Sequence, residues 1–210
     1  MSVDKYKRLP ISSQPEDGLN LLGSLDKFFI DHQNNQWELF TGKDCYPIVD
    51  VNGKLLVFVQ KLLGRPGVTR FGDSKNWNSW IYNNVGQEVF RLEKFNFGED
   101  TVQVFSGAVK LGTILKKTSW CPTINILNDE DVHVLTLKGR LLGLDTQHKF
   151  KIFTMDDNEI GEIKRTFLDE KKDYFSNDNY VATFPLSLDV KWKAILMAVM
   201  ILMDFTYSKR

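Results

Sequence analysis

One segment decides the fold of this chain: Asp189-Val-Lys-Trp-Lys-Ala-Ile-Leu-Met-Ala-Val-Met-Ile-Leu-Met-Asp-Phe205. Ten apolar residues follow one another without a break from Ala194 to Met203, so a helix here would be apolar on every side. Such a helix has to be buried in protein or in lipid. The run rises about 15 Å, which is half of a hydrocarbon core of about 30 Å. We therefore predict that residues 190–207 form a helix inside a protein core, with a membrane span as the alternative.

The core-facing or membrane-facing residues of this helix are Trp192, Ala194, Ile195, Leu196, Met197, Ala198, Val199, Met200, Ile201, Leu202 and Met203. Lys191 and Lys193 stand near its start and Asp204 near its end, whereas helix dipoles favour the opposite order. We expect Asp189 to cap the helix and to pair with a lysine, while the lysine stems lie along apolar surface with their charged ends in water. The alternative is that Lys191 and Lys193 contact lipid phosphates.

The composition argues against several classes of protein. Lysine plus arginine equals aspartate plus glutamate, at 27 each, whereas nucleic-acid binders carry a basic excess. Cys45 and Cys121 stand in no metal or redox spacing, so we expect buried free thiols. The sequence contains no phosphate-binding loop and no nucleophile elbow, and its histidines are scattered. We expect neither an enzyme nor a use of ATP, and the absence of a signal peptide points to the cytosolic side.

The order of the remaining segments predicts a mainly β domain over residues 18–207, after a polar and poorly ordered tail over residues 1–17. Apolar residues between Leu21 and Phe29 fall at helical spacing, which predicts a short helix or turn, and residues 37–40 are typical of a strand. Alternating strands joined by Asn, Asp or Gly turns follow at residues 48–58, 81–90, 102–116, 124–135 and 150–163. This pattern predicts a closed antiparallel β-barrel or a sandwich. A closed barrel would have a lumen for the apolar helix.

The segment before the helix carries oxygen atoms that suit a hard cation. Asp178, Asn179 and Asp189 are the main candidates, and Asp173, Asn177 and Ser187 are weaker ones. Calcium takes six to eight oxygen ligands, so few converging carboxylates imply weak affinity. On the spacing alone, a solvated turn and a helix cap are favoured over a calcium site.

A glycine-rich stretch at residues 64–73 contains Arg65 and Arg70. Both side chains could contact anionic lipid headgroups. A flexible connection is the simpler interpretation of this stretch.

Several motifs resemble the phospholipid scramblase family, which has a tubby-like fold. The most specific is Phe184-Pro-Leu-Ser-Leu-Asp-Val-Lys-Trp-Lys-Ala194, with Gly18-Leu-Asn-Leu-Leu22, Asn84-Val-Gly-Gln-Glu-Val89, Asp178-Asn179 and Asp204-Phe205 as further matches. The resemblance covers residues 18–207. It implies a closed β-barrel around a buried hydrophobic C-terminal helix, and calcium-dependent, ATP-independent movement of phospholipids between leaflets. It also places the calcium segment from Asp178 to Ser187.

This chain departs from the family pattern at several points. Members often carry aspartate where this chain has Ser187, and the start of the calcium segment is one residue shorter here. We find no proline-rich N-terminal region, so docking through such a region is not expected. The cysteine-rich palmitoylation run is replaced by residues 92–100, and the basic nuclear-import stretch is reduced to Lys164-Arg165.

Two functional hypotheses follow. The first is a calcium-responsive phospholipid scramblase on the cytosolic face of a membrane, the plasma membrane by family default and mitochondria as the alternative. It could act as a homo-oligomer. The second is a membrane-associated module that binds lipid headgroups or proteins while its C-terminal helix stays inside the barrel.

Overall fold

The computed structural model describes residues 18–30, 45–60, 77–94, 100–117, 122–139, 149–166 and 179–207. The tail at residues 1–17 and the strand predicted at residues 37–40 lie outside these ranges. The described elements are η2 (Gly18–Leu22), β1 (Lys27–Ile30), β2 (Cys45–Val49), β3 (Leu55–Gln60), β4 (Trp77–Asn83), β5 (Glu88–Lys94), β6 (Thr101–Ser106), β7 (Val109–Lys117), β8 (Thr123–Leu127), β9 (His133–Gly139), β10 (Lys149–Thr154), β11 (Glu159–Thr166), β12 (Asn179–Thr183) and α2 (Val190–Tyr207).

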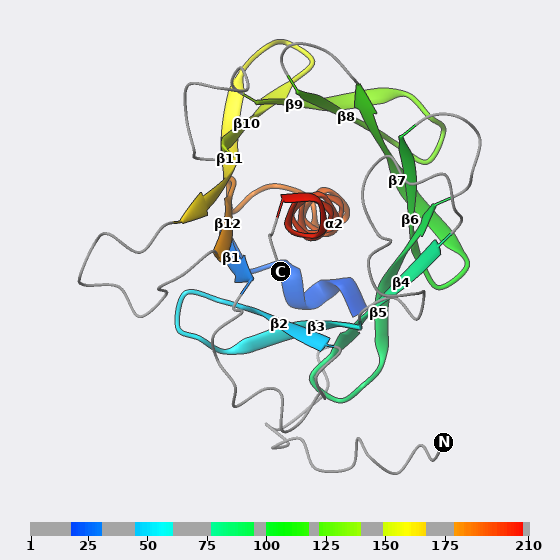
Figure 1. The fold of residues 1–210 in the computed structure, drawn as a ribbon, viewed down its shortest axis with the longest axis vertical. Helices are drawn as coiled ribbons and strands as arrows, with labels where there is room; N and C mark the ends of the chain where they lie inside the picture. The colour runs from blue at the N-terminus through cyan, green and yellow to red at the C-terminus, as the bar shows by residue number, and fades with distance from the viewer. Residues whose placement is uncertain are drawn as a thin grey trace.

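The strands form one closed antiparallel barrel that surrounds α2 (Figure 1). Each strand from β2 to β12 pairs with its neighbour in sequence, and β1 lies between β2 and β12 and closes the ring. At five of these pairs, β2–β3, β4–β5, β6–β7, β8–β9 and β10–β11, the antiparallel pairing follows from a tight turn, which returns the chain beside the strand that it leaves. The predicted barrel and its lumenal helix are confirmed.

The helical spacing between Leu21 and Phe29 gave a prediction that is only partly right. Leu21 and Leu22 lie on the 3-10 helix η2, but Phe28 and Phe29 lie on strand β1. Phe28 is paired with Ala182 of β12, and Phe29 with Val181 of β12 and Val49 of β2. A short apolar run fits either period, and here the open position in the barrel requires a strand.

Four of the hairpin turns have the same geometry. The turn residues Asp50, Asn83, Asn128 and Thr154 each receive a backbone hydrogen bond at their carbonyl oxygen from the residue three positions later. That later residue has a positive φ in every case: 76° at Gly53, 83° at Gly86, 61° at Asp131 and 59° at Asp157. Each first residue also accepts backbone N–H bonds at its side-chain oxygen. Asp, Asn and Thr bond their own turn backbone readily, so local chemistry specifies these hairpins.

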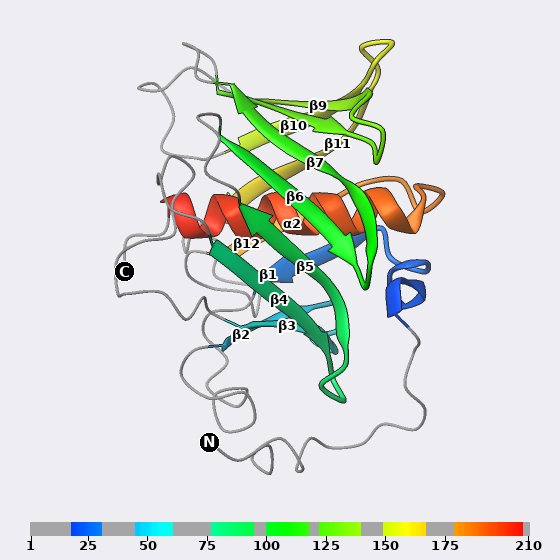
Figure 2. The same ribbon diagram turned by 90° about the vertical axis from the view of Figure 1, so that its right-hand side faces the viewer.

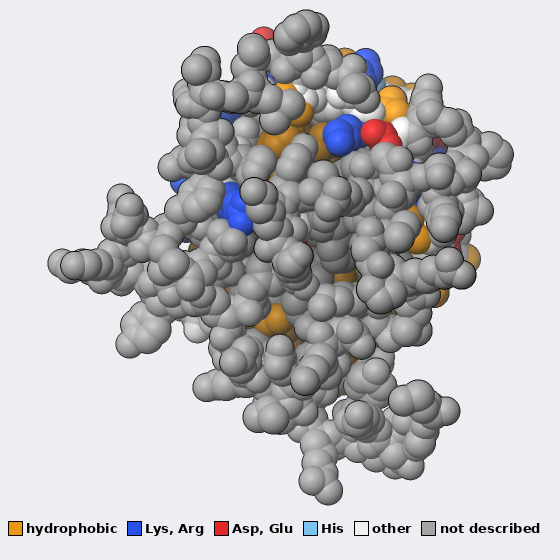
Figure 3. Space-filling model, in the orientation of Figure 1, with side chains coloured by type: hydrophobic (Ala, Val, Ile, Leu, Met, Phe, Trp, Pro, Cys, Tyr) orange, Lys and Arg blue, Asp and Glu red, His pale blue; other side chains and the backbone are white. Residues whose placement is uncertain are grey.

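The hairpin turns gather at one end of the barrel, because alternate connections of an up-and-down barrel lie at the same end. Figure 2 shows these turns on the side where α2 begins, together with η2 and the loop that precedes α2. Figure 3 views the opposite end, where few of the described side chains are visible. We call the first end the hairpin end, and the candidate site is built there.

The apolar run of α2 is enclosed by the barrel. Ala194 to Met203 are at most 1% exposed, and α2 packs against β7, β12 and η2. The approach to β7 is close: a Cβ added at Gly112 would lie 2.9 Å from Ile195 Cδ1 and 2.3 Å from the Leu127 carbonyl oxygen. Only glycine fits there. Among the described residues, no helix combines the length and the low charge that a membrane span requires.

Candidate functional site

The first turn of α2 is fixed by Asp189, as the sequence predicts. Asp189 Oδ1 accepts a hydrogen bond of 2.8 Å from the Lys191 backbone N–H, and the Asp189 carbonyl oxygen accepts bonds from Trp192 and Lys193. This is an N-cap, which satisfies N–H groups that have no partner within the helix. The predicted cap is confirmed, and Asp189 itself stays exposed at the hairpin end.

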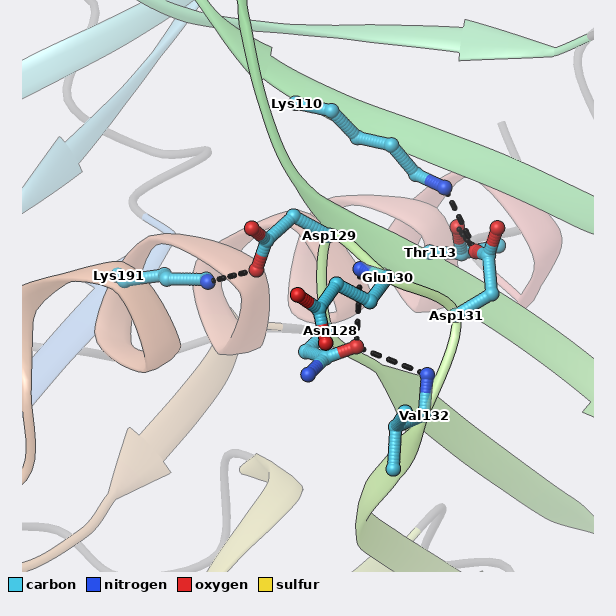
Figure 4. A network of polar contacts seen from close by, with 8 residues as sticks. All are labelled: Lys110, Thr113, Asn128, Asp129, Glu130, Asp131, Val132 and Lys191. Carbon is cyan, nitrogen blue, oxygen red and sulfur yellow. Dashed lines mark hydrogen bonds and ion pairs between the residues drawn. The ribbon is translucent and has the colours of Figure 1, made fainter.

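Lys191 pairs with a residue that the sequence analysis did not select. Its ammonium donates to the carboxylate of Asp129 in the β8–β9 turn (Figure 4). Asp189 is therefore not the partner of Lys191, although its charge acts on Lys193. The hydrogen bond from Lys191 lowers the pKa of Asp129. This ion pair links α2 to the barrel wall across 62 residues of sequence.

Two further carboxylates follow in the same turn. Asp131 Oδ1 accepts from Lys110 Nζ at 2.6 Å and from Thr113 Oγ1 at 2.8 Å (Figure 4). The bond from Lys110, and then that from Thr113, lower the pKa of Asp131. Glu130 stands between the two aspartates and is exposed. Two of these three carboxylates are thus already neutralised by lysines.

Lys193 is the most unusual charged residue of the site. It is 0% exposed, and its Nζ donates bonds of 2.9 Å each to the carbonyl oxygens of Gly23 and Leu186. The ring of Phe184 lies 5.8 Å from the ammonium, where a cation–π attraction adds to the bonds. Burial lowers the pKa of Lys193, while the charges of Asp26 and Asp189 act in the opposite direction. We call Lys193 and its two carbonyl partners the lysine clasp.

The lysine clasp contradicts the expected snorkelling of Lys193 and restricts its expected contact with lipid headgroups. The charged end of Lys193 does not reach water, so the expected snorkelling is wrong for this residue. A headgroup contact by Lys193 would first require the clasp to open. Lys191 is more accessible, with a side chain 29% exposed.

The other predicted site residues are divided between described and undescribed segments. Asp173, Asn177, Asp178, Arg65 and Arg70 lie outside the described ranges. Asn179 starts β12 opposite Thr166, and Ser187 is exposed in the loop before α2. Trp192 is half-buried against the core. Within the described part of the chain, no three acidic, histidine or cysteine side chains are arranged to hold a metal ion.

Sequence reasoning missed Asp129, Lys110 and Gly23 as members of the site. The run Asn128-Asp-Glu-Asp131 carried a signal, since three consecutive carboxylates exceed what a turn needs. Gly23 carried none, because its contribution is a backbone carbonyl. Its role depends on the loop after η2 reaching the start of α2.

Comparisons with known proteins agree with this architecture. The family model described as Scramblase matches residues 7–210. Human phospholipid scramblase 1 is 26% identical over 216 residues, which cover 94% of this chain and 67% of that protein. Bovine phospholipid scramblase 2 is 26% identical over 216 residues, covering 94% of this chain and 73% of the relative.

One solved structure supports the fold. The crystal structure of an Arabidopsis thaliana protein matches with a TM-score of 0.50 at 19% identity, covering 85% of this chain and 89% of the other. At that identity the match concerns the fold alone. The family model spans nearly the whole chain, including the barrel, the capped turn and the buried helix, and this chain therefore belongs to the scramblase family.

Proposed function

We propose that this protein moves phospholipids between the two leaflets of a membrane without ATP and in response to calcium. The observation that carries the proposal is the family match over residues 7–210, which includes the segment before α2 and the helix itself. The matched relatives are named phospholipid scramblases. The proposed site of action is the cytosolic face of a membrane.

The enclosed helix sets a physical condition on this proposal. Ala194 to Met203 are sealed inside the barrel, so a mechanism in which α2 enters the bilayer needs a second, open arrangement. Two polar connections would have to break first: the lysine clasp and the Lys191–Asp129 ion pair. Both lie at the hairpin end, so a change at this one end would free the first turn of the helix.

Calcium remains part of the proposal, with Asp178, Asn179 and Asp189 as main ligands and Asp173, Asn177 and Ser187 as weaker ones. The described residues fit a cation only in part. Asp189 is exposed but uses one carboxylate oxygen for the cap, and a set of six to eight oxygens would need the side chains around Asp178. We therefore expect weak binding and assign calcium no individual step.

The test is lipid flipping in proteoliposomes that contain only this protein and a fluorescent lipid, quenched from outside with and without calcium. Asp178→Ala and Asp189→Asn run in parallel. Asn also caps helices well, so Asp189→Asn removes the charge while it keeps the cap. We expect calcium to speed the loss of inner-leaflet fluorescence and both variants to respond less. No acceleration at millimolar calcium would contradict direct scrambling.

A second candidate function is favoured by the burial of α2. In this hypothesis the protein is a membrane-associated regulatory module that binds headgroups or proteins and keeps its helix inside the barrel. Such a protein should leave membranes after high-salt or alkaline washing. Retention after both treatments would argue against it, because only an inserted segment resists both.

A further inference from the structure

The exposed large aliphatic residues of the described chain share one location. They are Val51, Val85, Val109, Val132, Met155 and Leu186. Single exposed aliphatic residues are ordinary on a protein surface. Every strand connection that the structure describes lies at the hairpin end, so the informative feature is that each of these turns presents one such residue and the middle of no described strand does. Five belong to or flank the five described hairpin turns, and Leu186 lies in the loop before α2. We call these six residues the apolar rim.

The topology places the whole apolar rim at the hairpin end. The five turns connect β2 to β3, β4 to β5, β6 to β7, β8 to β9 and β10 to β11, which are alternate connections of the barrel. β12 runs antiparallel to β11, so the loop after β12 reaches the same end. Figure 2 shows these connections together on one side of the molecule. The rim therefore surrounds the barrel opening at which α2 begins.

Four of the rim turns share the hydrogen-bonded geometry described above, so their backbone conformations are specified locally. Val109 and Leu186 lie outside these four turns and are the most exposed members, at 65% and 59%. Fixed aliphatic tips that point away from the core lose little conformational entropy when a partner covers them.

The charges between these tips favour one kind of partner. Carboxylates outnumber cations at the rim even when the cations paired with them are counted. Eight carboxylates, Asp50, Glu88, Asp129, Glu130, Asp131, Asp156, Asp157 and Asp189, stand against five cations, Lys54, Arg91, Lys110, Lys138 and Lys191. Such a surface repels anionic lipid but suits the outward-facing ammonium groups of zwitterionic headgroups. Aliphatic points spread around a ring also match a broad, soft interface better than a single protein groove.

We propose that the apolar rim docks this protein, hairpin end first, onto the interface of a zwitterionic phospholipid bilayer. The aliphatic tips enter the boundary between headgroups and acyl chains, where apolar side chains gain free energy on burial. The inference rests on the proposed function in taking phospholipid as the partner. It adds the orientation: the barrel opening and the first turn of α2 face the membrane.

One residue connects this surface to the helix. The Leu186 side chain belongs to the rim, while the Leu186 carbonyl oxygen accepts a bond from Lys193 Nζ. Docking would therefore bring the lysine clasp to the membrane surface.

The test is flotation of the full chain with phosphatidylcholine vesicles, without calcium. One variant carries Val→Thr at positions 51, 85, 109 and 132, with Met155→Gln and Leu186→Gln. Threonine has nearly the shape of valine, so the turns should survive, and thermal unfolding checks this. The matched control carries Val→Ile at the same four positions and Met155→Leu. We expect the polar variant to bind at least about tenfold more weakly and the control to bind like the natural chain.

A second measurement reads the orientation directly. In a chain with Cys45→Ser and Cys121→Ser, an environment-sensitive dye is attached either at Val132→Cys or at Asn78→Cys, an exposed position on the barrel wall. Vesicles should shift the emission of the rim dye to shorter wavelength and leave that of the wall dye unchanged. Vesicles rich in phosphatidylserine should bind more weakly without calcium.

Any of four outcomes overturns the proposal: the natural chain does not float, the polar variant floats as well as the control, both dyes shift alike, or anionic vesicles bind better. A dimer that the polar substitutions abolish, with vesicle binding unchanged, would assign the rim to a second copy of the chain. Lipid flipping without rim-dependent docking would leave the proposed function standing and remove this inference. Docking without lipid flipping would keep this inference and contradict the proposed function.

Discussion

The two parts of α2 are held in the barrel by different forces. From Ala194 to Met203 the helix is enclosed by apolar side chains, and such contacts are non-directional and roughly proportional to the area buried. Its first turn is held by the Lys191–Asp129 ion pair and the lysine clasp. Directional polar contacts can exchange for water or headgroups at little cost, whereas apolar burial cannot. The comparison suggests that any release of α2 starts at its first turn.

The largest expected effect comes from the apolar part. Leu196→Ala removes a side chain that is 0% exposed and should lower the free energy of unfolding by about 2–5 kcal/mol. Leu186→Ala is the matched control, since its side chain is 59% exposed, and should change it by less than about 0.5 kcal/mol. Urea unfolding measures both. Equal losses would mean that α2 is not enclosed as described.

The contact between α2 and the wall can be tested at Gly112. A Cβ there would lie 2.3 Å from the Leu127 carbonyl oxygen and 2.9 Å from Ile195 Cδ1. We expect Gly112→Ala to cost about 1–3 kcal/mol of stability through overpacking. Adding Ile195→Val should recover only part of this, because the backbone clash remains. Urea unfolding of Gly112→Ala, Ile195→Val and the double variant measures these stabilities. A Gly112→Ala variant as stable as the natural chain would refute the close approach.

The polar part should respond more weakly. Lys193→Met keeps the length of the side chain but leaves the carbonyls of Gly23 and Leu186 without their donor. We expect a loss of about 1–2 kcal/mol. Lys191→Met removes a more accessible ion pair and should cost less than about 1 kcal/mol. The order of the two unfolding midpoints is the measurement, and the reverse order would disprove the clasp.

The smallest effect is a pH dependence with a defined sign. Burial lowers the pKa of Lys193 in the folded state below its ordinary value of 10.5. Between the two values the unfolded chain binds more protons, so stability rises with pH. The natural chain should therefore gain stability relative to Lys193→Met as pH rises toward 10.5, and show no such trend at lower pH. Parallel urea titrations test this, and a relative loss over the same window would contradict the burial of the charge.

The sequence predicted the barrel well where local chemistry controls it. Asp50, Asn83, Asn128 and Thr154 each begin a turn whose form depends on their own side-chain oxygen and on a following residue with positive φ. These signals lie within five residues, so the hairpins could be identified one by one. The strand nature of Phe28 and Phe29 could not be identified in this way, because it depends on β2 and β12.

In the candidate site, too, contacts within one turn could be predicted and contacts between distant segments could not. Asp189 could be identified as a cap because capping is decided within one helical turn. The partners of Lys191 and Lys193 could not, because Asp129 and Gly23 are far away in sequence. The calcium ligands and the headgroup contacts at Arg65 and Arg70 remain predictions.

By itself, the sequence determined that residues 194–203 must leave water and that the middle of the chain must form hairpins. Both follow from composition and short-range geometry, since ten consecutive apolar residues leave no polar face for solvent. Only the tertiary structure decided that the barrel, and not lipid, encloses the helix in the described state. It also decided that a buried lysine ties the first turn of α2 to two distant carbonyls and that six aliphatic tips share one end. These features depend on which segments meet when the sheet closes, and no local pattern encodes that.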